Sequence, residues 1–400
     1  MKLHTDEGLR NQFPALSTMT YLDSAGAGLP SRRVSNVMQR LTLDWASKGE
    51  NWEEWLMDVV NTRRAFAKMI GGKAEEVGVV PSVSVGLASL ASALKLKTRR
   101  KVVTSSLNFP TNVVLWQRMK EAGLLQNVTV LKHRRGQVPL DAWEKSIDDK
   151  TAVVAVDYVS WFSGARENIR EITEIAHRHG ALVVVDAFHA LSVIPLDVER
   201  DGVDMLACGF YKWLCGPHGA ACVYVRRDLL QDFMPSYIGW HGIRDNVIER
   251  LMQSRDPFDV PFALDRGTPS ATAARFEWGT WAPGVVAGAM EAMKFALELG
   301  LGPRFGEIKK RMNELRGGLE KIGLRKAMLT PSPDENQGAG ILTFGVREHS
   351  AFVSDLRKEG IVVSGRFDHV RISPHFYNTA EDVEKLIQAV RRIIKKRKTR

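Results

Sequence analysis

A lysine and an aspartate follow two neighbouring apolar runs of the sequence. Asp186 ends the run ALVVVD, and Lys212 comes shortly after the next run, VDMLAC, between Tyr211 and Trp213 and ahead of a Gly-Pro-His-Gly turn. A lysine desolvated in an apolar pocket has a lowered pKa and can form a Schiff base with a carbonyl compound. An acid at the end of a buried strand is often structural, but beside such a lysine it is a candidate catalytic group.

A third feature is a run of small and hydroxyl residues, PSVSVGLAS at 81–89, that opens a predicted helix. Backbone N–H groups and the positive end of the helix dipole at Val83 and Ser84 suit a phosphate group. Ordinary N-capping by Ser82 or Ser84 explains the same residues at least equally well. Pyridoxal phosphate would unite the three features, because its phosphate needs donors, its aldehyde an amine and its pyridine nitrogen an anion.

Short apolar runs rich in β-branched residues recur between helix-length segments. They predict a mostly parallel sheet buried on both faces, and therefore an α/β domain. Ligands of such sheets bind outside the carboxyl ends of the strands, where Asp186 and Lys212 would lie. The runs are VGVV at 77–80, KVVT at 101–104, VTVL at 128–131, TAVVAVDYV at 151–159, ALVVVDA at 181–187, VDMLAC at 203–208 and ACVYV at 221–225.

The sequence changes beyond about residue 285 to long amphipathic helical patterns, two short apolar runs (AGILTFGV and GIVVSG) and a final helix. Thr379 and Asp382 form a capping-box-like start for that helix. We expect a large domain over residues 15–285 and a smaller α+β domain over 286–400 that also takes in 1–14.

Longer motifs extend over nearly the whole chain. They are, in order, YLDSAGAGLPS at 21–31, SLNFPTNVVLWQ at 106–117, VDAFHALSVIPLDVERDGVDMLACGFYKWLCGPHGAACVYV at 185–225, FEWGTWAP at 276–283 and VRISPHFYNTAEDVEKL at 370–386. In order and spacing the sequence resembles the class V aminotransferase and cysteine desulfurase-like family of fold-type I pyridoxal-phosphate enzymes. The resemblance implies a large, mostly parallel seven-stranded α/β domain and a smaller C-terminal α+β domain.

The resemblance implies a role for each residue around the cofactor. Lys212 would form the Schiff base and later carry the Cα proton of the substrate. Asp186 would keep the pyridine nitrogen protonated, so that the ring accepts electrons from Cα. His189 would lie beside the phenolic oxygen of the cofactor, although a buried histidine can also be purely structural. Phe109 takes the position whose aromatic ring stacks on the pyridine, where many relatives have histidine.

The resemblance also assigns the groups that would bind the cofactor phosphate. They are Ser84 with the adjoining Val83 at the helix N-terminus, Tyr211, and Thr280 of the FEWGT motif. In this family the residue at the position of Thr280 reaches the site of a partner subunit. The resemblance therefore implies a homodimer with composite active sites.

The substrate carboxylate has its own expected ligands. Arg371 matches the arginine that binds the α-carboxylate of the substrate, and a guanidinium suits this task because it can donate two parallel hydrogen bonds. The loop of Ser24, Ala25 and Gly26 would close over the same carboxylate. Trp161 stands where many relatives have an asparagine that touches the cofactor oxygen, which leaves the orientation of the substrate there open.

The chain also departs from the family pattern at Gly209 and in its cysteines. Gly209 stands where relatives commonly have a serine, so one phosphate donor is missing. A cysteine desulfurase needs a nucleophilic thiol in a late loop, whereas the three cysteines, at 208, 215 and 222, lie on either side of Lys212. Their spacing matches no metal site, and they are too few for a disulfide framework. We interpret them as buried structural thiols, which disfavours a reaction through a protein persulfide.

These observations predict a pyridoxal-phosphate enzyme that acts on a free amino acid through an external aldimine, with cleavage of the Cα–H bond. Transamination and β-elimination of the C–S type are the leading outcomes. A kynureninase-like C–C hydrolase is the alternative, because GWHG at 239–242 and Tyr211 ahead of the lysine are reminiscent of that branch. Tryptophans in and near the motifs fit either an aromatic substrate or ordinary core packing.

The charge distribution favours small anionic ligands over nucleic acid. The net charge is +10, but the last ten residues, RRIIKKRKTR, carry seven positive charges and no acid. We interpret them as a solvated tail that follows the final helix and complements its dipole. A basic nucleic-acid-binding protein that uses this tail is the non-enzymatic alternative. The apolar runs are too short to cross a membrane and no signal segment is recognisable, so we expect a cytoplasmic protein.

Overall fold

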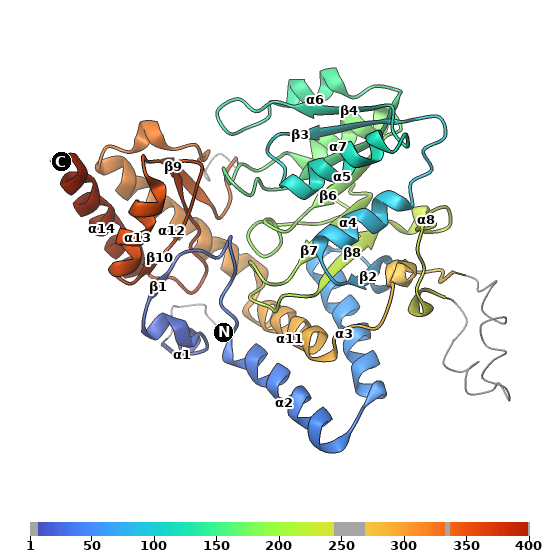
Figure 1. The fold of residues 1–400 in the computed structure, drawn as a ribbon, viewed down its shortest axis with the longest axis horizontal. Helices are drawn as coiled ribbons and strands as arrows, with labels where there is room; N and C mark the ends of the chain where they lie inside the picture. Colours follow the sequence, from blue (N-terminus) through green and yellow to red (C-terminus); the bar gives the residue numbers. More distant parts are fainter. Residues whose placement is uncertain (1–6, 244–268, 333–336, 399–400) are drawn as a thin grey trace.

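The computed structural model describes residues 7–243, 269–332 and 337–398, and its largest element is a seven-stranded sheet (Figure 1). The strand order is β2-β8-β7-β6-β5-β3-β4, and β8 alone runs in the direction opposite to the other six strands. Each predicted apolar run supplies one of the strands, so the mostly parallel seven-stranded sheet is confirmed. The strands are β2 (Val77–Val80), β3 (Lys101–Ser105), β4 (Asn127–Leu131), β5 (Thr151–Asp157), β6 (Leu182–Asp186), β7 (Met205–Gly209) and β8 (Ala221–Val225).

Helices cover both faces of this sheet. Val183 and Val185 of β6 belong to the apolar core on one face, and Val184 between them belongs to the core on the other. The alternation explains why the strand is apolar throughout. The first core is closed by α3 (Trp52–Ile70), α6 (Leu140–Ser146), α7 (Ile169–Arg178) and α11 (Pro283–Leu299), and the second by α4 (Val83–Ser92) and α5 (Pro110–Glu121).

The C-terminal elements gather on one side of the large sheet, coloured orange to red in Figure 1. They comprise the antiparallel strands β11 (Ser364–Arg366), β12 (His369–Ile372) and β9 (Leu342–Gly345), with the helices α12 (Leu301–Lys321), α13 (His349–Lys358) and α14 (Ala380–Lys398). The predicted capping box of α14 is confirmed. Thr379 N donates to Asp382 Oδ2 at 3.0 Å, and Asp382 N donates to Thr379 Oγ1 at 3.2 Å.

The N-terminal segment joins the two halves of the molecule. It contains α1 (Glu7–Arg10), β1 (Thr20–Tyr21) and α2 (Arg32–Lys48), and β1 pairs in parallel with β10 (Ile361–Val362) of the C-terminal half. Further along, Gly28 N donates to Tyr211 O at 2.7 Å. A Cβ atom on Gly28 would lie only 1.9 Å from Lys212 O, so this approach requires glycine. The domain limits at residues 14 and 285 stay a prediction.

The basic C-terminal residues differ from the predicted tail, because α14 continues through them to Lys398. Arg397 lies within ion-pair distance of Asp355 (3.3 Å) and of Glu348 (3.7 Å), and Arg392 pairs with Glu359. These positive charges are therefore part of a helix that packs on α13, and some are matched by acids there. No helix within the described residues is both long and apolar enough to span a bilayer.

Candidate active site

Most of the residues predicted to bind the cofactor meet in one cavity at the carboxyl ends of β5, β6 and β7. Asp157 and Asp186 are register partners at the ends of β5 and β6, and Lys212 follows three residues after β7. The cavity is lined by Ser82, Val83, Ser84, Phe109, Thr111, Asp157, Asp186, Phe188, His189, Gly209, Tyr211 and Lys212, among others. The sequence thus predicted most of its lining but not Thr111, Asp157 or Phe188.

Lys212 is a buried amine in the lining of this cavity. Its side chain is 8% exposed, and Nζ lies 2.8 Å from His189 Nε2. Burial lowers the pKa of Lys212 to about 8, with a further decrease from the charge of Arg371, while Asp186 and Asp157 act in the opposite direction. About a tenth of the amine is therefore unprotonated at pH 7, and this form is the one that nucleophilic attack requires.

Asp186 offers a carboxylate oxygen to the cavity. Its Oδ1 accepts a hydrogen bond from Phe188 N at 2.9 Å, and its Oδ2 accepts none from the described part of the chain. Burial raises the pKa of Asp186 to about 6, against the effects of the Phe188 amide and of Lys212, so the group is largely ionised at neutral pH. An anion with a free oxygen is available to a cationic partner bound in the cavity.

Asp157 is a buried acid that the sequence argument missed. It accepts hydrogen bonds from Phe109 N at 2.5 Å and from Asn112 Nδ2 at 2.9 Å. Burial, followed by the charge of Asp186, raises the pKa of Asp157 well above its usual value. The carboxyl group thereby fixes the loop that carries Phe109. The signal was present in the sequence, because Asp157 ends the run TAVVAVD as Asp186 ends ALVVVD.

The N-termini of α4 and α5 also line the cavity. Ser82 caps α4 by accepting a hydrogen bond from Val85 N at 3.2 Å, so the capping alternative is correct for Ser82. Ser84 is exposed, and its hydroxyl donates to Thr111 Oγ1 in the first turn of α5 at 3.4 Å. Two hydroxyls and the first turns of two helices suit a phosphate group.

Phe188 explains the departure at Gly209. A Cβ atom on Gly209 would lie 2.6 Å from Phe188 Cζ, so the phenyl ring occupies the space that a serine side chain would need. The same ring contacts Tyr211 edge to face at 4.9 Å between centroids, and its centroid is 4.1 Å from Lys212 Nζ. The Phe188 ring thus fills the space in which many relatives have a serine hydroxyl.

Arg371 lies on β12 and is 2% exposed. Its Nη1 donates to Trp161 O at 2.8 Å, its Nε donates to Ser364 Oγ at 3.1 Å, and its Nη2 is 3.4 Å from Asp23 Oδ1. Arg371 is not part of the cavity lining, but its charge lowers the pKa of both Lys212 and His189. A cation therefore stands near the predicted Schiff-base lysine.

The loop of Ser24, Ala25 and Gly26 lies beside the strand that carries Arg371. Ser24 N donates to Ser373 O at 3.2 Å, and Ala25 N donates to Ser373 Oγ at 2.9 Å. A Cβ atom on Gly26 would lie 2.5 Å from Oδ2 of Asp23, whose other carboxylate oxygen faces Arg371. The structure brings this loop close to the strand of Arg371, and the role of the loop in binding the substrate carboxylate stays a prediction.

Thr280 is not brought to the cavity of its own chain. It is exposed and lies in a separate hollow formed with Trp52, Trp55 and Trp281. Glu277, three residues earlier, anchors this segment by accepting hydrogen bonds from Arg63 Nε and from Val79 N, both at 2.8 Å. The role of Thr280 in the site of a partner subunit stays a prediction.

Comparison with known proteins identifies the family. The family model Aminotransferase class-V matches residues 20–386. The chain belongs to this family. The uncharacterized aminotransferase YcbU of Bacillus subtilis (strain 168) is 30% identical to it over 387 residues, 97% of this chain and 98% of the relative. A probable cysteine desulfurase of Aeropyrum pernix is 25% identical over 416 residues, 98% of each chain.

A solved structure agrees with this class V assignment. The apo structure of a cysteine desulfurase from Thermococcus onnurineus NA1 superposes with a TM-score of 0.84 at 23% identity, covering 98% of both chains, so the fold is shared. Class V aminotransferases use pyridoxal phosphate, and this chain is a pyridoxal-phosphate-dependent enzyme. The cavity fits that cofactor, because it combines the amine of Lys212, the free oxygen of Asp186, the ring of Phe109 and the helix N-terminus at Ser84.

Proposed function

We propose that the protein acts on a free α-amino acid by removing its Cα proton, with transamination or β-elimination of the C–S type as the outcome. The observation that carries this proposal is the meeting of Lys212, Asp186 and His189 in one cavity, with the charge of Arg371 acting on two of them. These groups supply an amine, an anion, a neutral hydrogen-bonding ring and a carboxylate ligand.

Pyridoxal phosphate supplies an aldehyde that captures the amino group and a ring that withdraws electrons from Cα. Asp186 would place its negative charge at the ring nitrogen. Arg371 would hold the α-carboxylate, and so orient the Cα–H bond toward Lys212. Lys212 Nζ, whose pKa burial lowers to about 8, would then accept the proton and return it. Phe109 would keep the ring in place from one face.

The cysteines argue against a persulfide carried by the protein. All three cysteines of the chain are buried, and burial raises the pKa of each thiol, to about 12 for Cys215. A thiol needs exposure and a lowered pKa to act as a nucleophile. We therefore propose that any sulfur cleaved from the substrate leaves as a free product.

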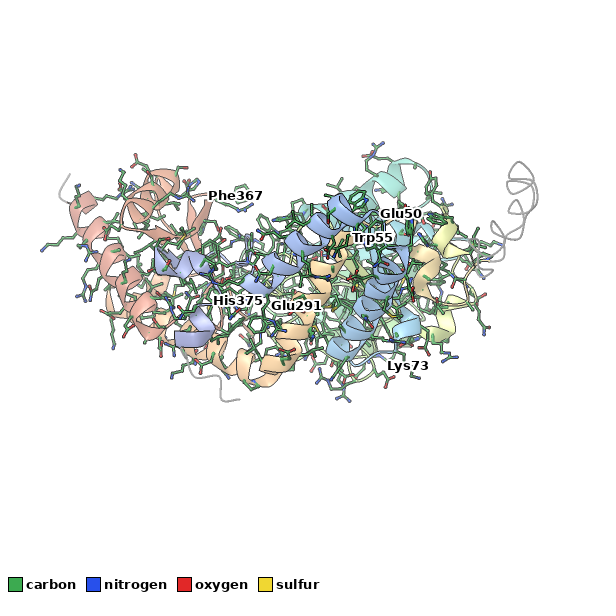
Figure 2. All side chains as sticks on the ribbon, turned by 90° about the horizontal axis from the view of Figure 1, so that it is seen from below. Glu50, Trp55, Lys73, Glu291, Phe367 and His375 are labelled. Atoms are coloured by element: carbon green, nitrogen blue, oxygen red, sulfur yellow. The ribbon has the colours of Figure 1, made fainter. Side chains whose placement is uncertain are left out.

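An aromatic cluster beside Arg371 favours a second candidate, a kynureninase-like hydrolase. The Trp161 ring contacts Phe109 and Phe367 at centroid distances of 5.5 and 6.4 Å, and Phe367 contacts Phe162 at 5.8 Å. Phe367, labelled in Figure 2, is 71% exposed, so this apolar surface opens to solvent. A substrate held by Arg371 and Lys212 would place an aromatic side chain along it.

The test is to incubate the holoenzyme with a panel of amino acids, with and without a 2-oxo acid, and to identify the products. Transfer of the amino group to the 2-oxo acid supports transamination, and release of pyruvate with sulfide or ammonia supports elimination. Alanine with an aromatic product, formed without a 2-oxo acid, supports the hydrolase. Turnover retained by Lys212→Ala would overturn all three.

We also propose that the enzyme is a homodimer whose phosphate site is completed by Thr280 of the partner subunit. The support is the exposed position of Thr280 outside its own cavity. Mixing inactive Lys212→Ala and weakened Thr280→Ala chains would then form hybrid dimers with one intact site, and activity should exceed the sum of the two parents. Additive activity after subunit exchange would contradict the shared site.

A further inference from the structure

Three buried side chains form a hydrogen-bonded chain that ends at the reactive lysine. Trp213 Nε1 donates to His189 Nδ1 at 3.3 Å, and His189 Nε2 lies 2.8 Å from Lys212 Nζ. Trp213 is 1% exposed, and His189 is also buried. Water therefore has little access to the nitrogen atoms, and their partners determine where the protons reside.

These hydrogen bonds determine which ring nitrogen of His189 carries the proton. Indole nitrogen only donates, so Nδ1 of His189 must be the acceptor. Burial and the nearby cations Lys212, Arg371 and Arg366 lower the pKa of His189 well below 6.5, which keeps the ring neutral. A neutral imidazole that accepts at Nδ1 carries its proton on Nε2. Nε2–H consequently points at Lys212 Nζ, and it donates to that nitrogen when the amine is unprotonated.

Trp213 is itself held by the C-terminal half of the chain. Its carbonyl oxygen accepts from His375 Nε2 at 2.9 Å and from Arg304 Nη2 at 3.1 Å. His375 is labelled in Figure 2, and its Nδ1 accepts from Phe376 N at 2.8 Å, so it too carries its proton on Nε2.

Arg304 is buried, and no carboxylate within the described residues forms an ion pair with it. Its guanidinium lies 4.2 Å from the centroid of the Phe376 ring. The buried cation is therefore matched by a carbonyl and an aromatic face. These contacts leave the indole little freedom to turn its N–H away from His189.

The geometry points to Trp213 as the positioning residue that fixes the tautomer of His189, so that Nε2–H is presented to Lys212 Nζ and to the adjacent phenolic oxygen of the cofactor. This inference rests on the proposed roles of His189 and Lys212. A donor at that oxygen withdraws the negative charge that otherwise holds a proton on the Lys212 nitrogen. Loss of the donor therefore raises the pKa of the bound chromophore.

The test is a spectrophotometric pH titration of the holoenzyme, followed in the visible band of the bound cofactor. Trp213→Phe removes the N–H and frees the proton of His189 to move to Nδ1, and we expect the pKa of the chromophore to rise by about one unit. In a His189→Gln background the same substitution should cause no rise, because an amide N–H donates without any choice of tautomer. Trp143→Phe deletes the same atoms from a core helix that lines a different cavity, and should leave the titration unchanged.

If Trp213→Phe shifts the pKa of the chromophore equally in the wild type and in His189→Gln, Trp213 acts only by packing. If it causes no shift in the wild type, the tautomer of His189 does not depend on the indole. Either result overturns the inference. If Trp213→Phe does not fold, benzothienylalanine at this position keeps the fused ring and replaces the N–H by sulfur. A wild-type protein that binds no pyridoxal phosphate would instead refute the cofactor site itself, which the inference presupposes.

Discussion

Gly28→Ala is the sharpest test of how the N-terminal segment holds the reactive lysine. The added Cβ would lie 1.9 Å from Lys212 O and 3.1 Å from Cys215 Sγ, whereas Cβ atoms essentially never approach closer than 3.0 Å. The backbones must therefore separate by about 1.1 Å, the difference between 3.0 and 1.9 Å. That movement breaks the 2.7 Å hydrogen bond from Gly28 N to Tyr211 O. Loss of the bond and overpacking together cost about 2–4 kcal/mol.

Two measurements on the same preparations check this estimate. Urea unfolding should give a lower free energy of unfolding for Gly28→Ala, and the visible absorption of the holoenzyme should weaken because Lys212 moves with its carbonyl. Gly306→Ala is the matched control, since nothing lies within 4 Å of its added Cβ on the exposed side of α12. We expect the control to stabilise the helix by about 0.5–1 kcal/mol. A free energy of unfolding and an absorption spectrum like those of the wild type would refute the reasoning.

Three further predictions concern charges. Cofactor-free enzyme should take up pyridoxal phosphate about ten times faster for each pH unit up to the Lys212 pKa of about 8, and the rate should level off above that pH. The reason is that only the neutral amine attacks the aldehyde. A plateau reached only above pH 10 would contradict this prediction. Arg371→Lys should raise KM for the amino acid about tenfold to a hundredfold in steady-state kinetics, because one arm of the bidentate grip on the carboxylate is lost; an unchanged KM would remove Arg371 from the site. Arg63→Met should lower the free energy of unfolding in urea by about 3–5 kcal/mol, because it leaves the carboxylate of Glu277 buried without a cation. Glu277→Gln in that background should recover part of the lost stability. If it recovers none, the buried charge is not the cause.

The strands of the large sheet were predictable because each is apolar on both faces, as Val183, Val184 and Val185 illustrate. Their order was not, since it depends on crossovers that no single strand encodes. β12 was not predicted, because its four residues, HVRI, include a histidine and an arginine and do not form an apolar run. Its strand conformation becomes evident only from its pairing with β9. The prediction of a basic tail was wrong because α14 continues to Lys398, and the run of charges in the sequence does not show whether a helix continues through it.

The position of Lys212 and Asp186 in one site was predictable, because each is an ionisable residue that ends an apolar run or follows shortly after one. Thr111 could not be predicted from the sequence, and the only sign of Asp157 there is its place at the end of the run TAVVAVD. Asp157 matters because β5 and β6 place their last residues side by side, and Thr111 because the first turns of α4 and α5 converge. The reason for Gly209 lies in the ring of Phe188, which the sequence places 21 positions away with no sign of contact.

The pairing of β1 with β10 also has a consequence for biosynthesis. Asp23 bonds to Ser364 across 341 positions, and Arg10 bonds to Asp382 across 372. Arg10 and Asp23 must therefore wait until residues 364–382 have left the ribosome before they can dock, while the central sheet can form earlier. A chain terminated before residue 351 would lose Arg371 and β10 together. Such a product would retain the central sheet and yet lack the arginine that is proposed to hold the substrate carboxylate.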